Sequence, residues 1–517
     1  MRRREFLALG ALGAAGVASG FAGATTRPRN IVVIGSDEHN PRFFGHLGHV
    51  ASTPNMDRLA SEGVRLDRLY TSSPICAPTR GSFLTGLWPQ EHSQINNGTV
   101  LNSGHTLLSA FFGEQGYSTA CFGKLHTNGD EANDPYGFDQ LLNINSLDWS
   151  QVQGDYYDHS GGAAYYDAGD QAAFTGSAAA SMLGRAQPRA GQNRDYVLAK
   201  EAISWMTQAR SKPFFCYLSA LAPHYPFTMP EDFFYLFDPD KVTLPGGLDE
   251  ATLRAVSPGA GRSLDDHAWT SMSEDLQRRC YARYLGMVAW MDHVVGMVLD
   301  ALETNGLAED TIVLYVSDHG DMAGEHGLWL KSLMFEGACR KAAILKVPGV
   351  LQPGRVSTTP MNEVDVLPTL AGFAGLGHAL PSSVISGRSR AEAIARSAAG
   401  FADRHIERHG VEVSDYAFSH YLMSGTKPWM SLVVTPTHKY VRYYRSVGDL
   451  VFDSELYDTD ADPWETNSLA DDAASSERIA ELNEQLELHL AEMKDPLFPI
   501  DKDQITSYPS ERAELLF

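Results

Sequence analysis

Three continuous apolar runs are the clearest pattern in the chain, and polar residues follow the first and the third directly. The runs occupy residues 30–36 (NIVVIGS), 212–221 (KPFFCYLSAL) and 311–317 (TIVLYVS). Runs of this length and composition are typical of strands that are buried on both faces. Between the second and third runs, residues 274–305 carry apolar positions at helical spacing, and Gly306 marks the end of the predicted helix. Strands that alternate with helices predict an α/β fold with a large, mostly parallel sheet flanked by helices.

The last part of the chain has a different pattern. Short strand-like runs occupy residues 416–423, 429–435 and 438–445, and residues 475–493 have the pattern of an amphipathic helix. These elements predict a smaller C-terminal α+β domain. The predicted division is a leader over residues 1–24, a catalytic domain over residues 28–400 and a C-terminal α+β subdomain over residues 401–517.

The N-terminus has the pattern of an export signal. Arg3 and Arg4 precede a Gly/Ala-rich apolar stretch that ends in the triplet AGA at residues 22–24. Twin arginines, a mildly apolar core and an A-x-A end predict a twin-arginine signal peptide, and hence a periplasmic or secreted protein. A membrane anchor would need a longer apolar stretch than this glycine-rich one. No later segment looks apolar for long enough to cross a bilayer, so we expect no membrane in the mature form.

Charge and cysteine content narrow the possible functions. The chain has 517 residues and a formal net charge of −23, which argues against binding of nucleic acid. An anion would therefore need a local basic pocket in an acidic body. The five cysteines are spread along the chain without a C-x-x-C pair, which argues against a disulfide framework or a structural zinc site. Cys76 differs from the other four because of its neighbours.

The most specific motif lies at residues 73–86, SPICAPTRGSFLTG. It contains Cys76, Pro78 and Arg80 in a C-x-P-x-R pattern, followed by Leu-Thr-Gly. Taken alone, C-x-P-x-R could arise by chance around a structural cysteine. The whole segment resembles the signature of the sulfatase family, in which this cysteine is oxidised to formylglycine by a formylglycine-generating enzyme. The resemblance implies a hydrated aldehyde that attacks sulfur with one hydroxyl and releases sulfate through the other, whereas serine would remain sulfated.

Acidic residues follow two of the predicted strands. Asp37 and Glu38 follow the first strand, and Asp318 and His319 follow the third. The carboxyl ends of parallel strands are where ligands bind in such sheets, and carboxylates that meet there repel one another unless a cation lies between them. Oxygen ligands indicate Ca²⁺, with Mg²⁺ or Mn²⁺ as alternatives. Taken singly, each aspartate would more often be a cap or turn residue.

The family resemblance implies a set of metal ligands. They are Asp37, Glu38, the formylglycine from Cys76, Asp318 and His319. Many family members have a second aspartate where this chain has Glu38. The longer side chain leaves open whether Glu38 binds the metal, and with it the coordination number and the identity of the ion.

Three short segments, GKLH, PHYPF and GEHGLWLK, resemble the segments that supply basic residues in this family. A sulfate ester carries a negative charge and develops more on its leaving oxygen. The resemblance implies that Arg80, Lys124 and Lys331 neutralise this charge. It also implies that His224 donates a proton to the leaving group and that His126 accepts one during sulfate release. Each lysine alone would be read as a solvated surface charge, but their joint order along the chain favours an active site.

The resemblance covers most of the chain and includes residues 53–60 (TPNMDRLA) and 456–465 (LYDTDADPWE). Residues 318–331 look most similar to choline-sulfatase-like and polysaccharide-sulfatase-like members. The predicted reaction is hydrolysis of the sulfate monoester of a carbohydrate or small alcohol to the alcohol and sulfate. Residues 153–192, rich in Gly, Ala, Ser and Tyr, are expected to form a long surface excursion that faces this small-molecule or glycan substrate.

Three other functions would account for parts of the sequence. A phosphonate or phosphate-ester hydrolase on the same scaffold could use the same nucleophile and metal, since a fold does not fix a reaction. A non-catalytic glycan-binding relative should have lost some of the basic and nucleophilic residues that this chain retains. A metal-binding structural protein would explain the carboxylates but not Cys76.

Overall fold

The computed structural model describes most of the chain between residues 29 and 493. Outside the described part lie residues 1–28, 103, 132–133, 144–181, 185, 188–189, 268–271, 381–384, 399–406, 409–410, 413–415, 422–428, 445–450 and 494–517. The leader predicted over residues 1–24 therefore lies outside the described residues.

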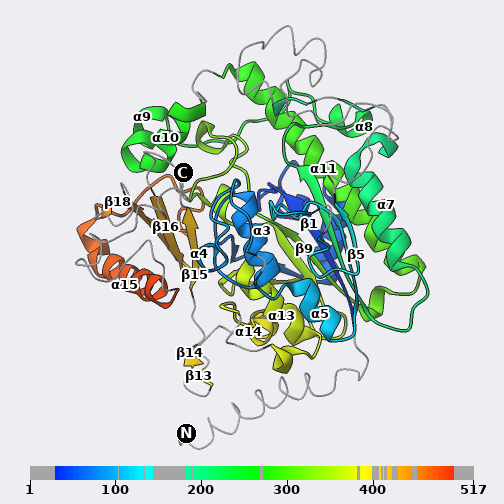
Figure 1. Cartoon of the computed structure of the whole chain (residues 1–517). Helices are drawn as coiled ribbons and strands as arrows, with labels where there is room; N and C mark the ends of the chain where they lie inside the picture. The colour runs from blue at the N-terminus through cyan, green and yellow to red at the C-terminus, as the bar shows by residue number, and fades with distance from the viewer. Residues whose placement is uncertain are drawn as a thin grey trace, which may run out of the picture.

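One large sheet forms the centre of the molecule (Figure 1). Its strand order is β11-β2-β10-β9-β1-β7-β4-β5, and β9, β1, β7, β4 and β5 run parallel to their neighbours in that series. The bounds are β1 Asn30–Asp37, β2 Val64–Leu66, β4 Ser118–Gly123, β5 Gln140–Asn143, β7 Phe214–Pro223, β9 Thr311–Ser317, β10 Ala343–Lys346 and β11 Arg355–Ser357. Only β10 is antiparallel to its two neighbours, so the predicted mostly parallel α/β sheet is confirmed.

The three apolar runs of the sequence form the middle of this sheet. β1 lies between β9 and β7, with Val32 opposite both Val313 and Cys216. β1 and β9 match the predicted runs, while β7 begins and ends two residues later than expected. Because successive side chains alternate between faces, Val32 and Ile34 pack into one core and Ile31 and Val33 into another.

Helices cover both faces of the sheet (Figure 1). On one side lie α2 (Pro54–Glu62), α7 (Arg194–Met206), α8 (Glu231–Phe234) and α11 (Glu274–Thr304). On the other lie α3 (Cys76–Thr85), α5 (Leu108–Glu114), α13 (Val366–Phe373) and α14 (Ala391–Ala398). The other described α-helices before the second sheet are α4 (Pro89–His92), α9 (Glu250–Val256), α10 (Pro258–His267) and α12 (Glu336–Cys339).

The longest helix, α11, corrects the expectation that no later segment is apolar for long enough to cross a bilayer. By length and composition it could cross a membrane, although most of that stretch is buried inside the fold. Tyr284, Trp290 and Val294 are among its fully buried residues. The apolar content of α11 is therefore accounted for by packing against the sheet.

A second sheet lies beside the first (Figure 1). It is antiparallel, with the order β15 (Ala417–Tyr421), β16 (Trp429–Val434), β17 (His438–Tyr444) and β18 (Val451–Asp458). One face packs on the first part of the chain at Tyr70 and Met334, and the other packs on α15 (Ser476–Glu492). The predicted C-terminal strands and helix are confirmed, but β18 was recognised in the sequence only as part of a motif.

Short two-stranded pairs complete the described structure: β3 (Leu69–Tyr70) with β12 (Met361–Asn362), β6 (Ala186–Gln187) with β8 (Met229–Pro230), and β13 (Glu407–Arg408) with β14 (Val411–Glu412). The residues just before β6 correct the expectation of a surface excursion over residues 153–192. Most of the excursion predicted over residues 153–192 lies outside the described residues, but Met182 and Leu183 are fully buried in the core. This end of the segment is therefore anchored in the fold and is not a surface loop.

Candidate active site

Two buried carboxylates meet at the carboxyl ends of the central strands. Asp37 is the last residue of β1, and Asp318 directly follows β9. The Asp318 amide donates to the Ser36 carbonyl at 3.1 Å, and Asp318 Oδ1 accepts from the Glu38 amide at 3.2 Å. These bonds fix the two strand ends side by side, as the position of both residues after parallel strands predicts.

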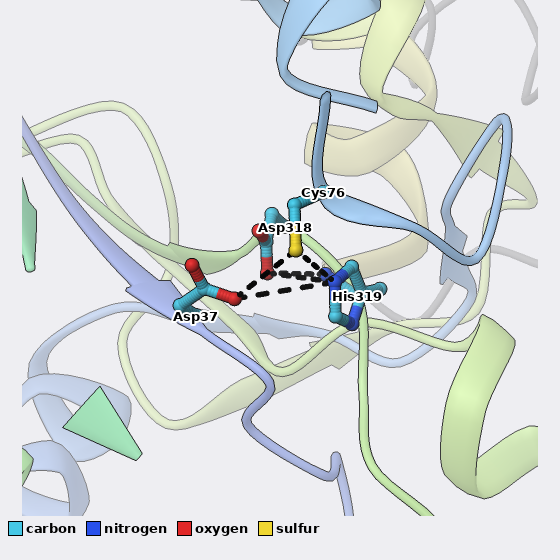
Figure 2. A group of neighbouring side chains, drawn as sticks. All are labelled: Asp37, Cys76, Asp318 and His319. Atoms are coloured by element: carbon cyan, nitrogen blue, oxygen red, sulfur yellow. Dashed lines mark hydrogen bonds and ion pairs between the residues drawn. The ribbon is translucent and has the colours of Figure 1, made fainter. Parts of the chain in front are cut away.

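Cys76 lies directly above this pair, at the first residue of α3 (Figure 2). Its Sγ lies 3.2 Å from Lys331 Nζ, 3.3 Å from His319 Nε2 and 3.7 Å from Asp37 Oδ1. Burial alone would raise the pKa of the Cys76 thiol, but Lys124, Lys331 and His319 hold it well below its ordinary value. The pocket therefore stabilises negative charge at the position of Sγ.

Four side chains form a group that could hold a metal ion. Asp37, Cys76, Asp318 and His319 each offer one ligand atom, and these atoms all lie within 4.8 Å of one another (Figure 2). His319 Nδ1 lies 2.9 Å from the Gly320 carbonyl, which can only accept a hydrogen bond. Nδ1 therefore carries the proton, so that Nε2 faces the group as a metal-ligating nitrogen would.

The electrostatics of this group also favour a cation. Burial raises the pKa of Asp318, and the nearby charge of Asp37 raises it further. Burial would lower the pKa of His319, but Asp318 and Cys76 outweigh it and raise the pKa to about 9. A positive charge is therefore stabilised where the side chains converge, and the donors fit a divalent cation.

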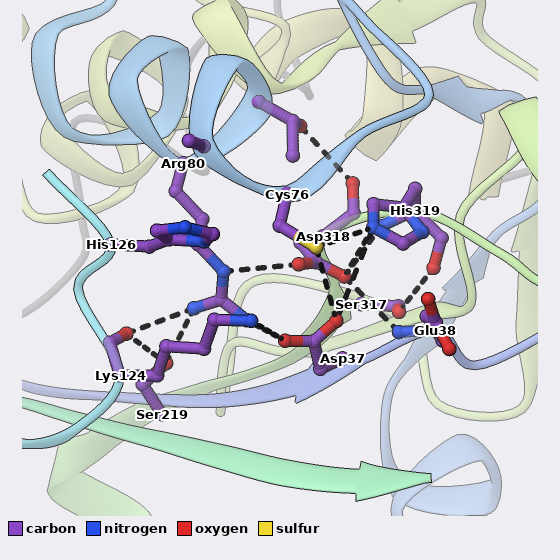
Figure 3. A network of polar contacts seen from close by, with 12 residues as sticks. Asp37, Glu38, Cys76, Arg80, Lys124, His126, Ser219, Ser317, Asp318 and His319 are labelled. Carbon is purple, nitrogen blue, oxygen red and sulfur yellow. Dashed lines mark hydrogen bonds and ion pairs between the residues drawn. The ribbon is translucent and has the colours of Figure 1, made fainter. Parts of the chain in front are cut away.

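Arg80 lies beside the two carboxylates and is paired with both (Figure 3). Its Nη2 lies 3.1 Å from Asp37 Oδ2, its Nε 3.0 Å from Asp318 Oδ2, and its Nη1 2.8 Å from Ser219 Oγ. Burial and Cys76 would raise the pKa of Asp37, but Lys124, His224 and Arg80 hold it below its ordinary value. The role of Arg80 in neutralising the sulfate stays a prediction; in the structure its donors contact the two carboxylates, Ser219 and the Lys124 carbonyl.

Lys124 supplies a second cation to the same carboxylate. Gly123 ends β4, and Lys124 Nζ lies 2.6 Å from Asp37 Oδ2. His126, two residues further on, contributes a hydrogen bond to Cys76, and its Nδ1 is buried without a partner among the described residues. The GKLH segment therefore brings both of its predicted site residues to the Cys76 pocket.

Glu38, His224 and Lys331 form a second cluster on the other side of Cys76. Lys331 Nζ contacts the Glu38 carboxylate and lies 3.1 Å from His224 Nε2, which in turn lies 3.5 Å from Glu38 Oε1. Glu38 groups here with Asp37 and His224, and it does not belong to the group around His319. Its Oε2 is buried with no hydrogen-bond partner in the described part of the chain, so one oxygen remains available to a further ligand.

Several residues that hold the site in its geometry were not predicted from the sequence. Asn97 Oδ1 accepts from the Ala77 amide at 2.9 Å and so caps the helix that begins at Cys76. Glu363, fully buried, accepts from the Ser72 amide and from Thr79 Oγ1 at 2.7 and 2.5 Å. Ser219, which anchors Arg80, lies inside an apolar strand. No spacing signal marks these residues, because each acts through a contact between distant segments.

Comparison with known proteins gives two matching families. A family model described as Sulfatase matches residues 29–376. A second, described as N-sulphoglucosamine sulphohydrolase, C-terminal, matches residues 324–492. Together they cover both sheets of the fold.

Individual relatives agree with these matches. Choline-sulfatase of Rhizobium meliloti is 28% identical over 369 residues, which is 68% of this chain and 69% of that protein. N-acetylglucosamine-6-O-sulfatase of Bacteroides thetaiotaomicron is 24% identical over 562 aligned positions, 95% of this chain and 91% of that protein. The structure of a phosphonate monoester hydrolase from Silicibacter pomeroyi superposes with a TM-score of 0.73 at 22% identity, covering 91% of this chain and 96% of that one, and thus shares the fold.

Proposed function

Because the chain belongs to the sulfatase family, we propose that it hydrolyses sulfate monoesters through a formylglycine made from Cys76, with a divalent cation beside it. The family and its sulfatase homologues make the protein a sulfuric ester hydrolase. A carbohydrate or small alcohol is the proposed alcohol half of the substrate. This choice follows the relatives named choline-sulfatase and N-acetylglucosamine-6-O-sulfatase.

The environment of Cys76 is the observation that carries this proposal. Burial raises the pKa of the thiols of Cys121, Cys216 and Cys339, as expected for structural cysteines. Cys76 is equally buried, but Lys124 and Lys331 hold its thiol pKa well below the ordinary value. Shifts of this direction in a buried polar pocket are typical of a reactive position.

The two groups that the family implies would each supply one part of the chemistry. Hydrated formylglycine supplies two hydroxyls on one carbon, one to attack sulfur and one through which sulfate is released. A divalent cation supplies positive charge to a sulfate oxygen and to the attacking group. Asp37, Asp318 and His319 would hold that cation, together with the modified residue in place of the Cys76 thiol.

The remaining side chains neutralise the substrate, transfer protons or hold the carboxylates in place. Lys331 and Lys124 place positive charge beside Cys76, where the sulfate group would lie, and stabilise the charge that develops there. His224 lies beside Lys331 and donates a proton to the leaving oxygen, while His126 accepts a proton from the group at position 76. Arg80 keeps the two carboxylates paired and in place.

The nucleophile is tested by mass spectrometry of the purified protein together with an activity panel. We expect the peptide containing residues 74–80 to carry formylglycine, about 18 Da lighter than the cysteine form, and turnover to rise in proportion to its fraction. The panel contains choline sulfate, sulfated sugars and an aryl sulfate. Phosphate and phosphonate monoesters are included because the fold is shared with a phosphonate monoester hydrolase.

Two controls make the outcome decisive. Cys76→Ser, made in a host that cannot oxidise serine, should lose turnover while keeping the melting temperature of the unmodified protein. Full activity from protein whose Cys76 is an intact thiol would contradict the nucleophile. If a phosphonate or phosphate monoester is cleaved faster than every sulfate ester, the protein is a phosphonate or phosphate-ester hydrolase instead.

A further inference from the structure

The segment that carries Lys331 has an unusual backbone. Leu330 and Ser332, its two neighbours, have φ values of 66° and 71°. Residues other than glycine rarely adopt this left-handed conformation, which persists only where the surroundings enforce it. Something must therefore hold this segment in place.

Two of the restraints come from the catalytic domain. The Leu330 amide donates to Asp321 Oδ1 at 3.0 Å. The Ser332 amide donates to the Pro74 carbonyl at 3.0 Å, and Pro74 lies two residues before Cys76. Lys331 is thus tied through its own backbone to the segment that carries the nucleophile.

The far end of the same segment is held by β17 of the second sheet and by the segment that follows β18. Lys439 of β17 donates to the Met334 carbonyl at 2.7 Å, and Glu465 Oε2 accepts from the Glu336 amide at 2.6 Å. Lys439 and Glu465 are also paired with each other, and they are 0% and 1% exposed. One buried ion pair from the C-terminal part of the chain therefore fixes two backbone positions only three and five residues from Lys331.

A second buried carboxylate, that of Glu336, lies beside this pair. Lys439 Nζ also lies 3.5 Å from Glu336 Oε1, so that two buried carboxylates share one ammonium group. Burial would raise the pKa of Glu336, but Lys439, Arg340 and Arg68 lower it to about 2, so the carboxylate is charged. Buried ion pairs add little net stability because desolvation offsets their attraction, yet they accept few alternative geometries.

We propose that Lys439 and Glu465 are positioning residues that fix Lys331 beside Cys76, and that the second sheet is in this way part of the catalytic apparatus. This role rests on the proposed function of Lys331 in binding sulfate. The competing reading is that the pair only joins the two sheets. The two readings differ in whether its loss acts through Lys331.

The main test compares two variants on one strand. Lys439→Met removes the ammonium group but keeps a long side chain. Arg442→Met is the matched control, because Arg442 lies on the opposite face of β17 and pairs with Glu487 of α15. We expect Lys439→Met to lower kcat roughly 10- to 100-fold, the scale for a misplacement of about 1 Å in an active site. Arg442→Met should leave kcat unchanged even if it lowers the melting temperature.

A double-variant cycle shows whether the loss acts through Lys331. In a Lys331→Ala background, adding Lys439→Met should cost almost nothing more, since residues that act as one unit are not additive. Additive losses would overturn the positioning role. If Lys439→Met does not fold, Glu465→Gln takes its place, because it keeps an acceptor for the Glu336 amide and removes the charge next to Lys439.

Hydrogen exchange gives a readout that does not depend on turnover. Amides of residues 328–340 should exchange faster in Lys439→Met than in Arg442→Met, and unchanged protection in this segment would overturn the proposal. If Lys331→Ala keeps full activity, the function proposed for Lys331 fails, while the exchange result still decides whether Lys439 holds the segment. The failure of each idea is therefore recognised separately.

Discussion

At the scale of single residues, the site is a set of buried charges that are nearly balanced against one another. Asp37, Asp318 and Cys76 are matched by Arg80, Lys124 and Lys331, and all six side chains are buried or largely so. Such an arrangement costs desolvation and is a weak source of stability. Its value lies in placing charge beside a reacting group without water to screen it.

The first prediction at this scale concerns removal of the metal. Chelation should abolish turnover and lower the melting temperature, because Asp37 and Asp318 would then face each other without a divalent cation. Re-addition of Ca²⁺ should restore both, and separate additions of Mg²⁺ and Mn²⁺ compare the other candidate ions. Activity and thermal unfolding are measured on the same chelated sample.

Asp318→Asn serves as the control for this metal experiment. It keeps the size of the side chain and removes one ligand charge, so its melting temperature should no longer respond to added Ca²⁺. A chelated sample that metal analysis shows to be free of ions, yet that turns over normally, would show that no metal takes part.

At the scale of elements, the turn after β4 places Lys124. Gly123 has φ 124°, and a Cβ at this position would lie 1.9 Å from the Ser219 carbonyl oxygen. The Lys124 amide donates to that same oxygen at 3.0 Å. Only glycine lets the two strands approach closely enough for this bond, so the conformation of one residue decides where the lysine lies.

Gly123→Ala should therefore destabilise the protein by roughly 3 kcal/mol or more, the scale for backbone strain together with a forced clash. Gly113→Ala is the matched control, because Gly113 lies in α5 and an added Cβ would meet no atom within 4 Å. That change should be neutral or stabilise by up to about 1 kcal/mol. Denaturant unfolding of both variants measures the difference, and equal stabilities would show that the turn tolerates a side chain.

The elements that the sequence predicted best are the most deeply buried ones. β1 and β9 are covered on both faces, so nearly every position in them is apolar, and the run itself marks the strand. Short strands such as Val64–Leu66 and Ala343–Lys346 have no such run. Their pairing depends on neighbours that are distant in sequence, and local composition does not encode it.

At the scale of the whole molecule, two buried histidines join α15 to the second sheet. The ring of His489 stacks on Phe418, with centroids 3.7 Å apart, and on His420, at 5.3 Å. Burial lowers the pKa of His420 to about 3. Burial, with a contribution from His420, also lowers the pKa of His489 well below its ordinary value. Both rings are therefore neutral in the folded protein at moderately acidic pH.

These shifts predict that acid destabilises the protein. Below about pH 6.5 the unfolded chain takes up protons on both histidines while the fold excludes them, so stability present above that pH is lost as pH falls. His489→Phe should reduce the slope of unfolding free energy against pH by about 1.4 kcal/mol per pH unit, the value for one proton. The slope is measured by denaturant unfolding between about pH 4 and 7.

His378→Gln is the control for this slope, because it also removes one histidine but does so at an exposed position. A slope for His489→Phe equal to that of the unchanged protein would mean that His489 titrates alike in the folded and unfolded states. That result would contradict the buried environment described here.

The sequence by itself determined the fold class, the central strands and the motif residues that converge on Cys76. Burial makes strands continuously apolar, and parallel strands bring their carboxyl ends to one edge, so Asp37 and Asp318 could be expected together. The metal, the formylglycine and the export signal remain predictions.

Only the tertiary structure decided which of these side chains contact one another. In the structure Arg80 contacts the carboxylates, and Glu38 contacts Lys331 and lies near His224. Lys439 and Glu465 bind the backbone of the segment that carries Lys331. Contacts of this kind join residues more than 100 positions apart in the chain, as the bond from Lys439 to Met334 does. No local pattern in the sequence encodes these contacts, because they form only when segments that are distant along the chain pack together.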